Sequence, residues 1–302
     1  MGEVCPAANA AQAQRWNGAS GQYWIEHRER HLAEHQNLTP HLFRGAAIAP
    51  GERVLDVGCG CGHTTVAAAQ AARGGREADR GGSAIGLDLS APMLAVARGL
   101  AAQAGTGNAR FLRADAQACP LRAASCDVLI SSFGVMFFDD PRAAFANLAS
   151  VVRPRGRLAF LSWQDDTQNE LFAIPLRAFG VYTSPPTPSA SDLFVDPRQI
   201  IELLNGTGWE DIQVRSVNEP AWIGADVDDV MGYIRGMPAL RALTASLDDP
   251  GLREHVLAVV TEQYGARQRP DGIWVRAAAW LVTARRRAHN FPPQWGGPAQ
   301  GL

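Results

Sequence analysis

Three aspartates and a run of glycines are the residues whose types and spacing most clearly indicate chemistry. Residues 54–62 read VLDVGCGCG, so Asp56 stands before Gly58, Gly60 and Gly62. Glycine lets the backbone turn sharply and come close to a ligand. A helix that begins after such a loop presents unpaired N–H groups to an anion. The pattern therefore predicts a site for a carboxylate or phosphate between a strand and a helix.

The spacing of these glycines excludes two common nucleotide-binding motifs. A dinucleotide fingerprint that begins at Gly58 and Gly60 needs a third glycine where the chain has His63. A P-loop needs a lysine, but all 28 basic residues are arginine. The absence of lysine also excludes a lysine base or Schiff base. The pattern that remains is Asp-x-Gly-x-Gly-x-Gly.

Two further aspartates follow later apolar runs. Asp88 lies in GLDLS, where a carboxylate can accept hydrogen bonds from both hydroxyls of a ribose. Asp115 lies in RADA, where it can accept from an adenine amino group, and Met93 can form an apolar wall for the ring. Each aspartate alone could be a helix cap or a turn residue. Three of them at successive strand ends, after the glycine loop, favour a nucleoside site.

A parallel sheet must bring these residues together. Short apolar runs alternate with helical segments between residues 53 and 163, which predicts an α/β Rossmann-like fold with helices on both faces. The predicted strands cover residues 53–57, 83–88, 109–113, 127–131 and 157–163, and a strand over 211–217 and a last one over 275–285 follow. In such a sheet, ligands bind beyond the carboxyl ends of the strands.

The composition narrows the class of protein. The chain has 302 residues, 46% of them hydrophobic, and a net charge of −2, so it can bury a core and has no electrostatic reason to bind nucleic acid or an anionic membrane. Five scattered cysteines, with neither a signal peptide nor a long apolar segment, indicate the reducing cytoplasm. We expect a small-molecule partner, no nucleic acid, no membrane, and a monomer or homodimer.

The motifs together resemble the large bacterial family related to the ubiquinone/menaquinone-biosynthesis methyltransferases, which are class I S-adenosylmethionine (SAM)-dependent enzymes. The resemblance covers nearly the whole chain, and it is carried by residues 16–18 (WNG) with 23–24 (YW), 50–62, 86–94, 133–141 (FGVMFFDDP) and 153–163. It implies a seven-stranded, mostly parallel sheet with an antiparallel last strand, a helical lid and cap, and SAM as cofactor. Ser132, where many relatives carry arginine, and the long loop over residues 73–82 depart from the family pattern.

The resemblance also implies roles for residues. The backbone of the glycine loop would lie alongside the methionine part of SAM, and Asp56 would support the amino group of that part. Asp88 would bind the ribose, and Asp115 would bind the adenine. The residues expected to bind the cofactor are Tyr23, Asp56, Gly58, Gly60, Gly62, Asp88, Leu89, Met93, Asp115, Ala116, Ser131 and Phe133.

Aromatic side chains from the lid, the cap and the sheet predict an apolar or aromatic acceptor pocket. Any single one of them could instead fill the core between cap and sheet. The residues expected to contact the acceptor are Trp24, Met136, Phe137, Trp163, Phe172, Tyr182, Trp222 and Tyr233.

Three histidines, His27, His31 and His35, are spaced so that they would share one face of a helix. His27 and His31 are candidates for a general base; a metal site with Glu34 or His41, or a solvated helix face, are the alternatives. We expect no metal. Methyl transfer from a sulfonium requires mainly in-line positioning and exclusion of water, so catalysis can be positional only.

The predicted function is transfer of a methyl group from SAM to carbon, oxygen or nitrogen of a small, apolar or aromatic metabolite of specialised metabolism. A non-methylating reaction such as a cyclisation, and a non-catalytic SAM-binding scaffold, are alternatives with the same fold. A nucleic-acid methyltransferase would need a basic groove and a polar motif after the fourth strand, where residues 132–135 read SFGV. The predicted parts are a lid (1–49), a SAM-binding core (50–163), a cap insertion (164–196), a core helix and strand (197–218), a helical cap (219–272), a final strand (273–288) and a disordered tail (289–302).

Overall fold

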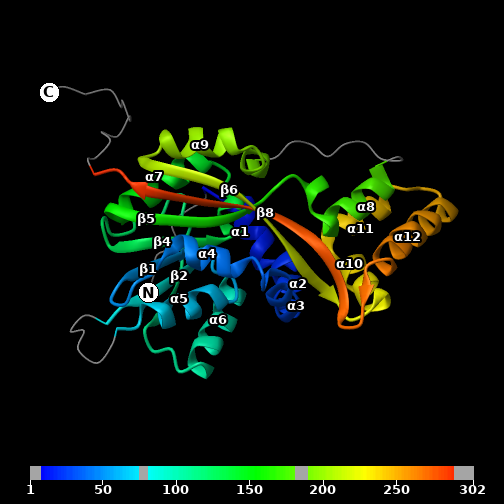
Figure 1. The fold of residues 1–302 in the computed structure, drawn as a ribbon, viewed down its shortest axis with the longest axis horizontal. Coiled ribbons are helices and arrows are strands. Elements are labelled where there is room, and N and C mark those ends of the chain that lie inside the picture. Colours follow the sequence, from blue (N-terminus) through cyan, green and yellow to red (C-terminus); the bar gives the residue numbers. More distant parts are fainter. Residues whose placement is uncertain (1–7, 75–80, 181–189, 289–302) are drawn as a thin grey trace.

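A single twisted β-sheet forms the centre of the protein (Figure 1). The computed structural model describes residues 8–74, 81–180 and 190–288. The strands are β1 (Arg53–Val57), β2 (Ser83–Asp88), β3 (Ala109–Arg113), β4 (Cys126–Ser132), β5 (Val152–Trp163), β6 (Trp209–Gly224), β7 (Gln268–Arg269) and β8 (Gly272–Arg286). They lie in the order β3-β2-β1-β4-β5-β8-β6, and β7 pairs with β8.

The direction of the strands confirms the predicted fold class. Strands β1 to β5 pair in parallel, whereas β8 is antiparallel to both β5 and β6. The seven strands of the main path correspond to the predicted seven, and the short strand β7 adds an eighth.

Helices cover both faces of the sheet (Figure 1). The helices are α1 (Ala10–Asn17), α2 (Ala19–Glu26), α3 (Arg28–His35), α4 (Thr39–Ala46), α5 (His63–Ala72), α6 (Ala91–Gln103), α7 (Pro141–Val151), α8 (Glu170–Gly180), α9 (Pro197–Asn205), α10 (Val227–Gly236), α11 (Pro238–Ala245) and α12 (Pro250–Gly265). Helices α4, α5 and α6 pack on one face, and α7 and α9 on the other. This two-sided cover explains why β1 and β4 are almost continuously apolar and buried.

Strands β6 and β8 continue beyond the sheet as a two-stranded ribbon that leads to the cap helices α8, α10, α11 and α12 (Figure 1). The sequence predicts a strand only over residues 211–217, because Pro220 and Gly224 are usual strand breakers. Pro220 is nevertheless paired with Arg276 inside β6. Since β6 lies at the edge of the sheet, proline removes no ladder hydrogen bond that the fold needs there.

The N-terminal helices α1 to α4 also differ in part from the prediction. Within the predicted lid (1–49), the first helix α1 begins at Ala10, and residues 1–7 lie outside the described part. The predicted helical face with three histidines is interrupted, because His27 ends α2 and precedes α3. No helix in the described ranges is long and apolar enough to cross a membrane.

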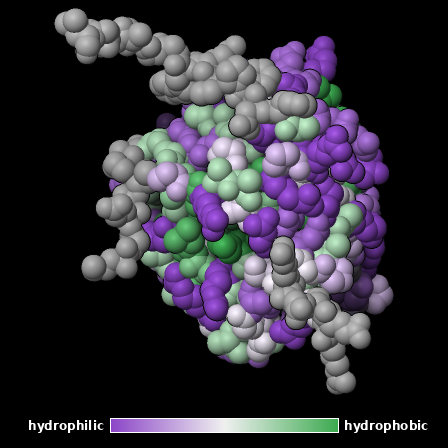
Figure 2. Space-filling view, turned by 90° about the vertical axis from the view of Figure 1, so that its left-hand side faces the viewer, coloured by the Kyte–Doolittle hydropathy of each residue, from purple (hydrophilic) through white to green (hydrophobic). Residues whose placement is uncertain are grey.

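Most large apolar side chains lie inside the protein. Hydrophilic residues cover much of the face shown in Figure 2, and the most strongly hydrophobic residues visible there are concentrated near its centre. The large apolar side chains that are exposed are Leu32, Ile85, Leu112 and Ile201. Isolated apolar residues of this kind are normal on a protein surface.

Candidate cofactor and acceptor site

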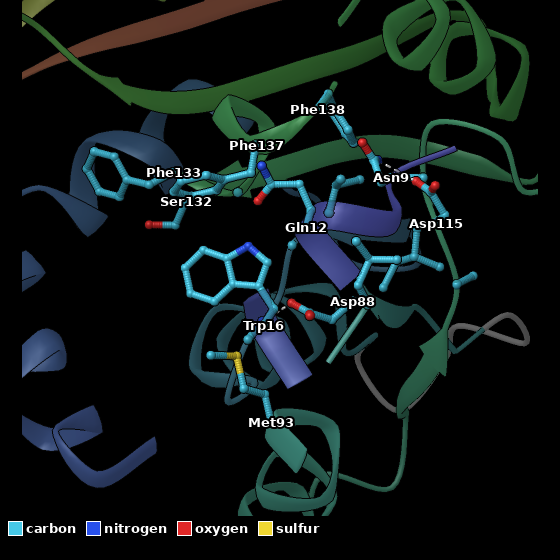
Figure 3. A pocket seen from close by; sticks show the side chains of 18 of the residues that line it. Asn9, Gln12, Trp16, Asp88, Met93, Asp115, Ser132, Phe133, Phe137 and Phe138 are labelled. Atoms are coloured by element: carbon cyan, nitrogen blue, oxygen red, sulfur yellow. Dashed lines mark hydrogen bonds between the residues drawn. The ribbon is translucent and has the colours of Figure 1, made fainter. Parts of the chain in front are cut away.

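A cavity of about 110 Å³ lies beyond the carboxyl ends of β1, β2, β3 and β4, at the edge of the sheet where the sequence predicts the site. Its wall comes from the glycine loop, the segments after β2, β3 and β4, and the helices α1 and α2. The lining residues are Asn9, Gln12, Trp16, Trp24, Val57, Gly58, Gly60, Leu87, Asp88, Leu89, Met93, Ala114, Asp115, Ala116, Ser132, Phe133, Gly134, Phe137 and Phe138. Most of these are apolar, and the carboxylates stand out among them (Figure 3).

The glycine loop passes two neighbours too closely for any side chain. All three glycines have positive φ, which only glycine adopts without strain. A Cβ on Gly58 would lie 2.7 Å from the Cα of Gly134, and one on Gly62 would lie 2.7 Å from the Cβ of Ala97. Gly58 and Gly62 are therefore required by packing within the protein.

Gly60 has a different environment. A Cβ there would come no closer than 3.8 Å to Sδ of Met93 and 4.0 Å to Nε1 of Trp24. Both of these residues line the cavity, as Gly60 itself does. The space above Gly60 is thus open on the cavity side and allows a ligand to approach the backbone.

Asp88 ties the glycine loop to the end of β2. Its Oδ2 accepts a hydrogen bond from the N–H of Gly60, and its Oδ1 accepts one from the N–H of Ser90, each at 2.8 Å. Burial raises the pKa of this carboxyl above its ordinary value, against the opposing effect of these backbone hydrogen bonds. The carboxylate lines the cavity and can exchange or share these bonds with a ligand.

Asp56 is fully buried beside the loop. Its Oδ2 accepts hydrogen bonds from the hydroxyls of Thr64 and Thr65, each at 2.6 Å. Its Oδ1 has no hydrogen-bond partner among the described residues. Burial raises the pKa of Asp56 to about 6. A buried carboxylate oxygen without a partner is costly, and a bound donor would remove that cost.

Asp115 lies at the far end of the cavity from the glycine loop and is linked to α1 (Figure 3). Its Oδ1 accepts hydrogen bonds from the side-chain amide of Asn9 and the N–H of Gln117, each at 2.9 Å. The Asn9 side chain in turn accepts a hydrogen bond from the N–H of Asp139 at 2.9 Å.

The other residues expected at the cofactor divide into two groups. Leu89, Met93, Ala116 and Phe133 line the cavity. Gly62, Ser131 and Tyr23 do not, and neither does the fully buried Asp56, which lies behind the glycine loop. The Ser131 hydroxyl donates to the carbonyl of Val57 at 2.7 Å, and the cavity wall at the end of β4 is formed by Ser132 instead. The Tyr23 hydroxyl donates to the carbonyl of Tyr233 at 2.6 Å, on the cap side.

The residues expected at the acceptor are spread over the cavity and the neighbouring cap. Trp24 and Phe137 line the cavity. Trp163 stacks on the lining residue Phe133 at 4.0 Å, and Phe172 meets Trp163 edge-on at 6.2 Å. Met136 is buried, with its sulfur 3.4 Å from the N–H of Trp163. Trp222 and Tyr233 flank the guanidinium of Arg30 instead, and Tyr182 lies outside the described residues.

Phe133 adopts an unusual backbone conformation, with φ at +62°. A bulky residue in the left-handed region is strained, and such residues concentrate at functional sites. The conformation places the ring against Trp163 and against His35, whose ring centroid is 4.7 Å away. The three rings form an aromatic platform at one wall of the cavity.

The histidines of the lid lie next to this wall but do not line the cavity. His31 is 7% exposed and stacks on Trp24. Its Nδ1 lies 3.5 Å from Oε2 of Glu34 and 3.4 Å from the Tyr233 hydroxyl, while its Nε2 is buried without a partner among the described residues. Burial lowers the pKa of His35 to about 4.

Glu34 is the buried acid between these histidines. Burial alone would raise its pKa, but the hydrogen bond from His31 and the nearby basic groups lower it below its ordinary value. No group of three or more histidine, cysteine, aspartate or glutamate side chains in the described ranges is arranged to hold a metal ion.

Sequence reasoning missed three residues of α1 that line the cavity: Asn9, Gln12 and Trp16. Their spacing puts them on one face of a helix, so the pattern could have indicated a polar face with one aromatic anchor. The signal is weak because α1 is short and contributes no buried apolar residue.

Comparison with known proteins identifies the domain. Residues 54–156 match the model of a family described as "Methyltransferase domain". The chain carries a methyltransferase domain. This domain contains the glycine loop, Asp88 and Asp115, whereas α1 and most of the cap lie outside the matched residues.

Two curated relatives are similar to part of this chain. An uncharacterized protein of Mycobacterium bovis is 37% identical over 126 residues, which are 42% of this chain and 42% of that protein. The match therefore spans less than half of that relative's length. The malonyl-[acyl-carrier protein] O-methyltransferase of a Methylovorus species is 30% identical over 203 residues, or 66% of this chain and 62% of the relative.

A solved structure supports the same fold. Phosphoethanolamine N-methyltransferase 2 of Haemonchus contortus, solved in complex with S-adenosyl-L-methionine, aligns with a TM-score of 0.52 at 17% identity. The alignment covers 94% of this chain and 60% of that one. The similarity extends beyond the methyltransferase domain to the rest of the described fold.

Proposed function

We propose that this protein is a SAM-dependent methyltransferase that acts on a small molecule. One observation carries the proposal: Asp88, Asp115 and the glycine loop line a single cavity within the methyltransferase domain. Carboxylates at the ends of adjacent strands are the acceptors that ribose hydroxyls and a purine amino group require.

The residues present fit the cofactor. Asp88 would hold the ribose hydroxyls, Asp115 would accept from the adenine amino group, and the open space at Gly60 would receive the methionine part. The unpartnered Oδ1 of Asp56 suits the support of an ammonium group close to the loop. When bound, SAM supplies a methyl group that is already activated by the positive sulfur. The protein then contributes alignment of the acceptor and exclusion of water.

The acceptor we propose is apolar or aromatic, because the wall nearest the end of β4 is aromatic. Phe133 and Phe137 line the cavity there, Trp24 lies on the lid side, and Trp163 supports Phe133 from behind. Such a wall can bind a flat apolar molecule because the contact buries apolar surface and allows the rings to stack. The relative named as an O-methyltransferase favours an oxygen acceptor.

Transfer to an O–H or N–H group also requires removal of a proton, and we assign this role to His31 rather than His27. Because His31 stacks behind the lining residue Trp24, the role requires that Trp24 turn aside so that the acceptor reaches Nε2. The ionised Glu34 beside Nδ1 favours the tautomer with hydrogen on Nδ1 and leaves Nε2 as a proton acceptor. Nε2 is buried and unpartnered within the described chain, whereas His27 packs against Tyr23 and Tyr233 at the helix junction.

The remaining proposals concern family and setting. The glycine loop and the carboxylates agree with the subgroup related to ubiquinone/menaquinone biosynthesis, and we propose the predicted lid, core and cap as functional parts. We also propose that the protein acts in the cytoplasm and on metabolites, since no disulfide joins cysteines of the described residues and the net charge is −2.

Calorimetric titration with SAM tests the proposal. We expect wild-type protein to bind SAM and the Asp88→Ala variant to lose at least about tenfold in affinity, since a charge-assisted pair of hydrogen bonds is removed. Asp228→Ala, an exposed aspartate in α10, is the matched control and should bind like wild type. Acceptors are then screened by product mass, in which methylation adds one CH₂ unit and a cyclisation adds none. Absence of SAM binding by wild type would contradict the proposed function.

A further inference from the structure

Helix α1 forms the outer wall of the cavity opposite the ends of the strands. It contributes Asn9, just before its first turn, and Gln12 and Trp16 from one face (Figure 3). The Asn9 side chain points toward Asp115, whereas Gln12 and Trp16 extend toward the side of the cavity that carries Ser132, Phe133 and Phe137 (Figure 3). None of them belongs to the residues that match the methyltransferase domain.

The contacts that fasten α1 are few and nearly all polar. At one end, Asn9 bonds to Asp115 and to the backbone of Asp139. At the other end, Asn17 donates to the carbonyl of Leu89 at 3.1 Å and accepts from the N–H of Ala91 at 3.0 Å. Of these partners, Leu89 and Asp115 line the same cavity.

Helix α1 has no share in the hydrophobic core of the described chain. No residue of Ala10–Asn17 is buried, and no side chain from residues 8–17 belongs to the core cluster, although the polar Asn9 just before the helix is only 2% exposed. Its apolar contacts are made by Trp16, whose ring meets Phe137 edge-on at 5.0 Å and Trp24 edge-on at 6.1 Å. Segments with few buried apolar contacts open locally at low free-energy cost. Gly18 separates α1 from α2, so α1 can move without breaking a longer helix.

Two observations link the position of α1 to an occupant of the cavity. The Oε1 atom of Gln12 is buried and has no partner among the described residues, and the side chain points into the cavity (Figure 3). A bound ligand with an N–H or O–H group would satisfy it. The amide of Asn9 and the N–H of Gln117 both donate to Oδ1 of Asp115. Within the described chain, Oδ2 of that carboxylate accepts no hydrogen bond. Asn9 thus fixes the orientation in which Asp115 presents its second oxygen.

We propose that α1 is a strap that must lift from the rim before the cofactor can enter or leave, and that Asn9 is a positioning residue that couples strap closure to the adenine contact of Asp115. This inference rests on the proposed function, since it assigns the cavity to SAM. With the strap closed, Asn9 holds Asp115 for the adenine amino group and Gln12 gains a partner. With the strap open, both contacts are lost together.

A disulfide between strap and rim provides the direct test. Because the Asn9 side chain already reaches the backbone of Asp139, Asn9→Cys with Asp139→Cys would lock the strap. Cys5→Ser and Cys119→Ser leave only the buried Cys59, Cys61 and Cys126 beside the introduced pair. The reduced and oxidised forms of this one variant are matched controls, because they differ only in the bond.

The probe is S-adenosylhomocysteine, measured by stopped-flow tryptophan fluorescence. Oxidation before the ligand is added should slow association at least about tenfold, and oxidation afterwards should slow release by a similar factor. If the reduced and oxidised forms both bind the probe with equal association and release rates, the strap proposal is wrong. If neither wild type nor the reduced variant binds the probe, the proposed function fails as well.

A second variant tests Asn9 without a cross-link. Asn9→Ala should raise the release rate of S-adenosylhomocysteine at least about tenfold, as expected for the loss of a hydrogen bond to a charged group. It should also reduce the preference for this probe over its inosyl analogue, in which a carbonyl replaces the adenine amino group. Asn37→Ala, which removes an exposed amide that bonds to the carbonyl of Pro220, is the matched control. An unchanged preference in Asn9→Ala would overturn the positioning role, because a merely structural loss would weaken both probes equally.

Discussion

Trp24 and His31 lie face to face, with ring centroids 3.7 Å apart and planes inclined by only 11°. Trp24 lines the cavity and His31 does not, so the imidazole supports the cavity wall from the lid side. The same imidazole faces Glu34 with Nδ1 and leaves Nε2 without a partner in the described chain. A single side chain therefore combines support of the wall with the properties of a proton acceptor, and a substitution that preserves the ring can separate the two roles.

His31→Phe is that substitution. Phenylalanine keeps a flat ring against Trp24 but cannot accept a proton, so affinity for S-adenosylhomocysteine should change by less than about threefold. Once an O–H or N–H acceptor has been identified, the rate of methyl transfer should fall by about 100-fold or more, the usual contribution of a general base. His27→Phe is the matched control and should retain most activity. Full activity of His31→Phe would show that catalysis is positional only.

The ionisation of Asp56 should control cofactor binding at low pH. Burial raises the pKa of Asp56 to about 6, so the carboxyl of the empty protein becomes neutral below that pH. An ammonium group is held by the ionised form. The dissociation constant for S-adenosylhomocysteine should therefore be constant above pH 7 and rise by up to about tenfold per unit below pH 6.

Calorimetry between pH 5 and pH 8 checks this prediction. Asp56→Asn should bind more weakly at pH 7 and lose the dependence below pH 6. If wild type and Asp56→Asn show the same pH dependence, another group is responsible and Asp56 does not hold the ammonium.

Two neighbouring glycines should respond differently to alanine. A Cβ on Gly58 would lie 2.7 Å from a backbone atom of Gly134, so Gly58→Ala should lose about 2–4 kcal/mol of unfolding free energy through overpacking and a positive φ. A Cβ on Gly60 meets no atom closer than 3.8 Å, so Gly60→Ala should lose only about 1 kcal/mol but should bind S-adenosylhomocysteine poorly. Denaturant unfolding measures the stability of both variants, and calorimetry measures their affinity for S-adenosylhomocysteine. Each variant is the control for the other. Equal stability of the two variants would contradict the packing argument.

His35 should make the protein less stable at mildly acidic pH. Burial lowers the pKa of His35 to about 4 from 6.5, so the unfolded chain takes up a proton at higher pH than the folded protein does. The contribution of neutral His35 is fully present above pH 6.5 and is lost as the pH falls toward 4, by at most about 3 kcal/mol.

The comparison uses His35→Phe, which keeps a ring against Phe133 and does not titrate. Between pH 7 and pH 4.5, the free energy of unfolding should fall less in this variant than in wild type. The exposed His255→Phe should follow the wild-type curve. If the free energy of unfolding falls equally with pH in wild type and His35→Phe, His35 is not the cause of the loss of stability in acid.

The edge of the sheet that lines the cavity could be predicted because its residues depend on local backbone geometry. Asp56, Asp88 and Asp115 each follow a short apolar run, and parallel strands necessarily bring their carboxyl ends together. The α1 wall could not be predicted in the same way, because its position depends on two asparagines that bond to distant backbone and side-chain groups. Such contacts leave no periodic signal in the sequence.

The length of strand β6, which leads into the cap, could not be predicted from the sequence either. Local propensity ends the strand near Pro220, whereas the structure continues it because β8 offers a partner along its whole length. Long-range pairing here overrides a local preference. The interruption of the lid at His27 is likewise invisible to a helical pattern that continues through it.

The place of β8 also has a consequence for how the protein is made. Strand β8 is inserted between β5 and β6, and within the described chain it is the sole neighbour of β6 in the sheet. On the ribosome, residues up to about 270 can emerge with β5 exposed at one edge and β6 unpaired. The final fold can close only when residues 272–286 have left the exit tunnel. A nascent chain stalled before that point should be a preferred client of chaperones that recognise unpaired strands.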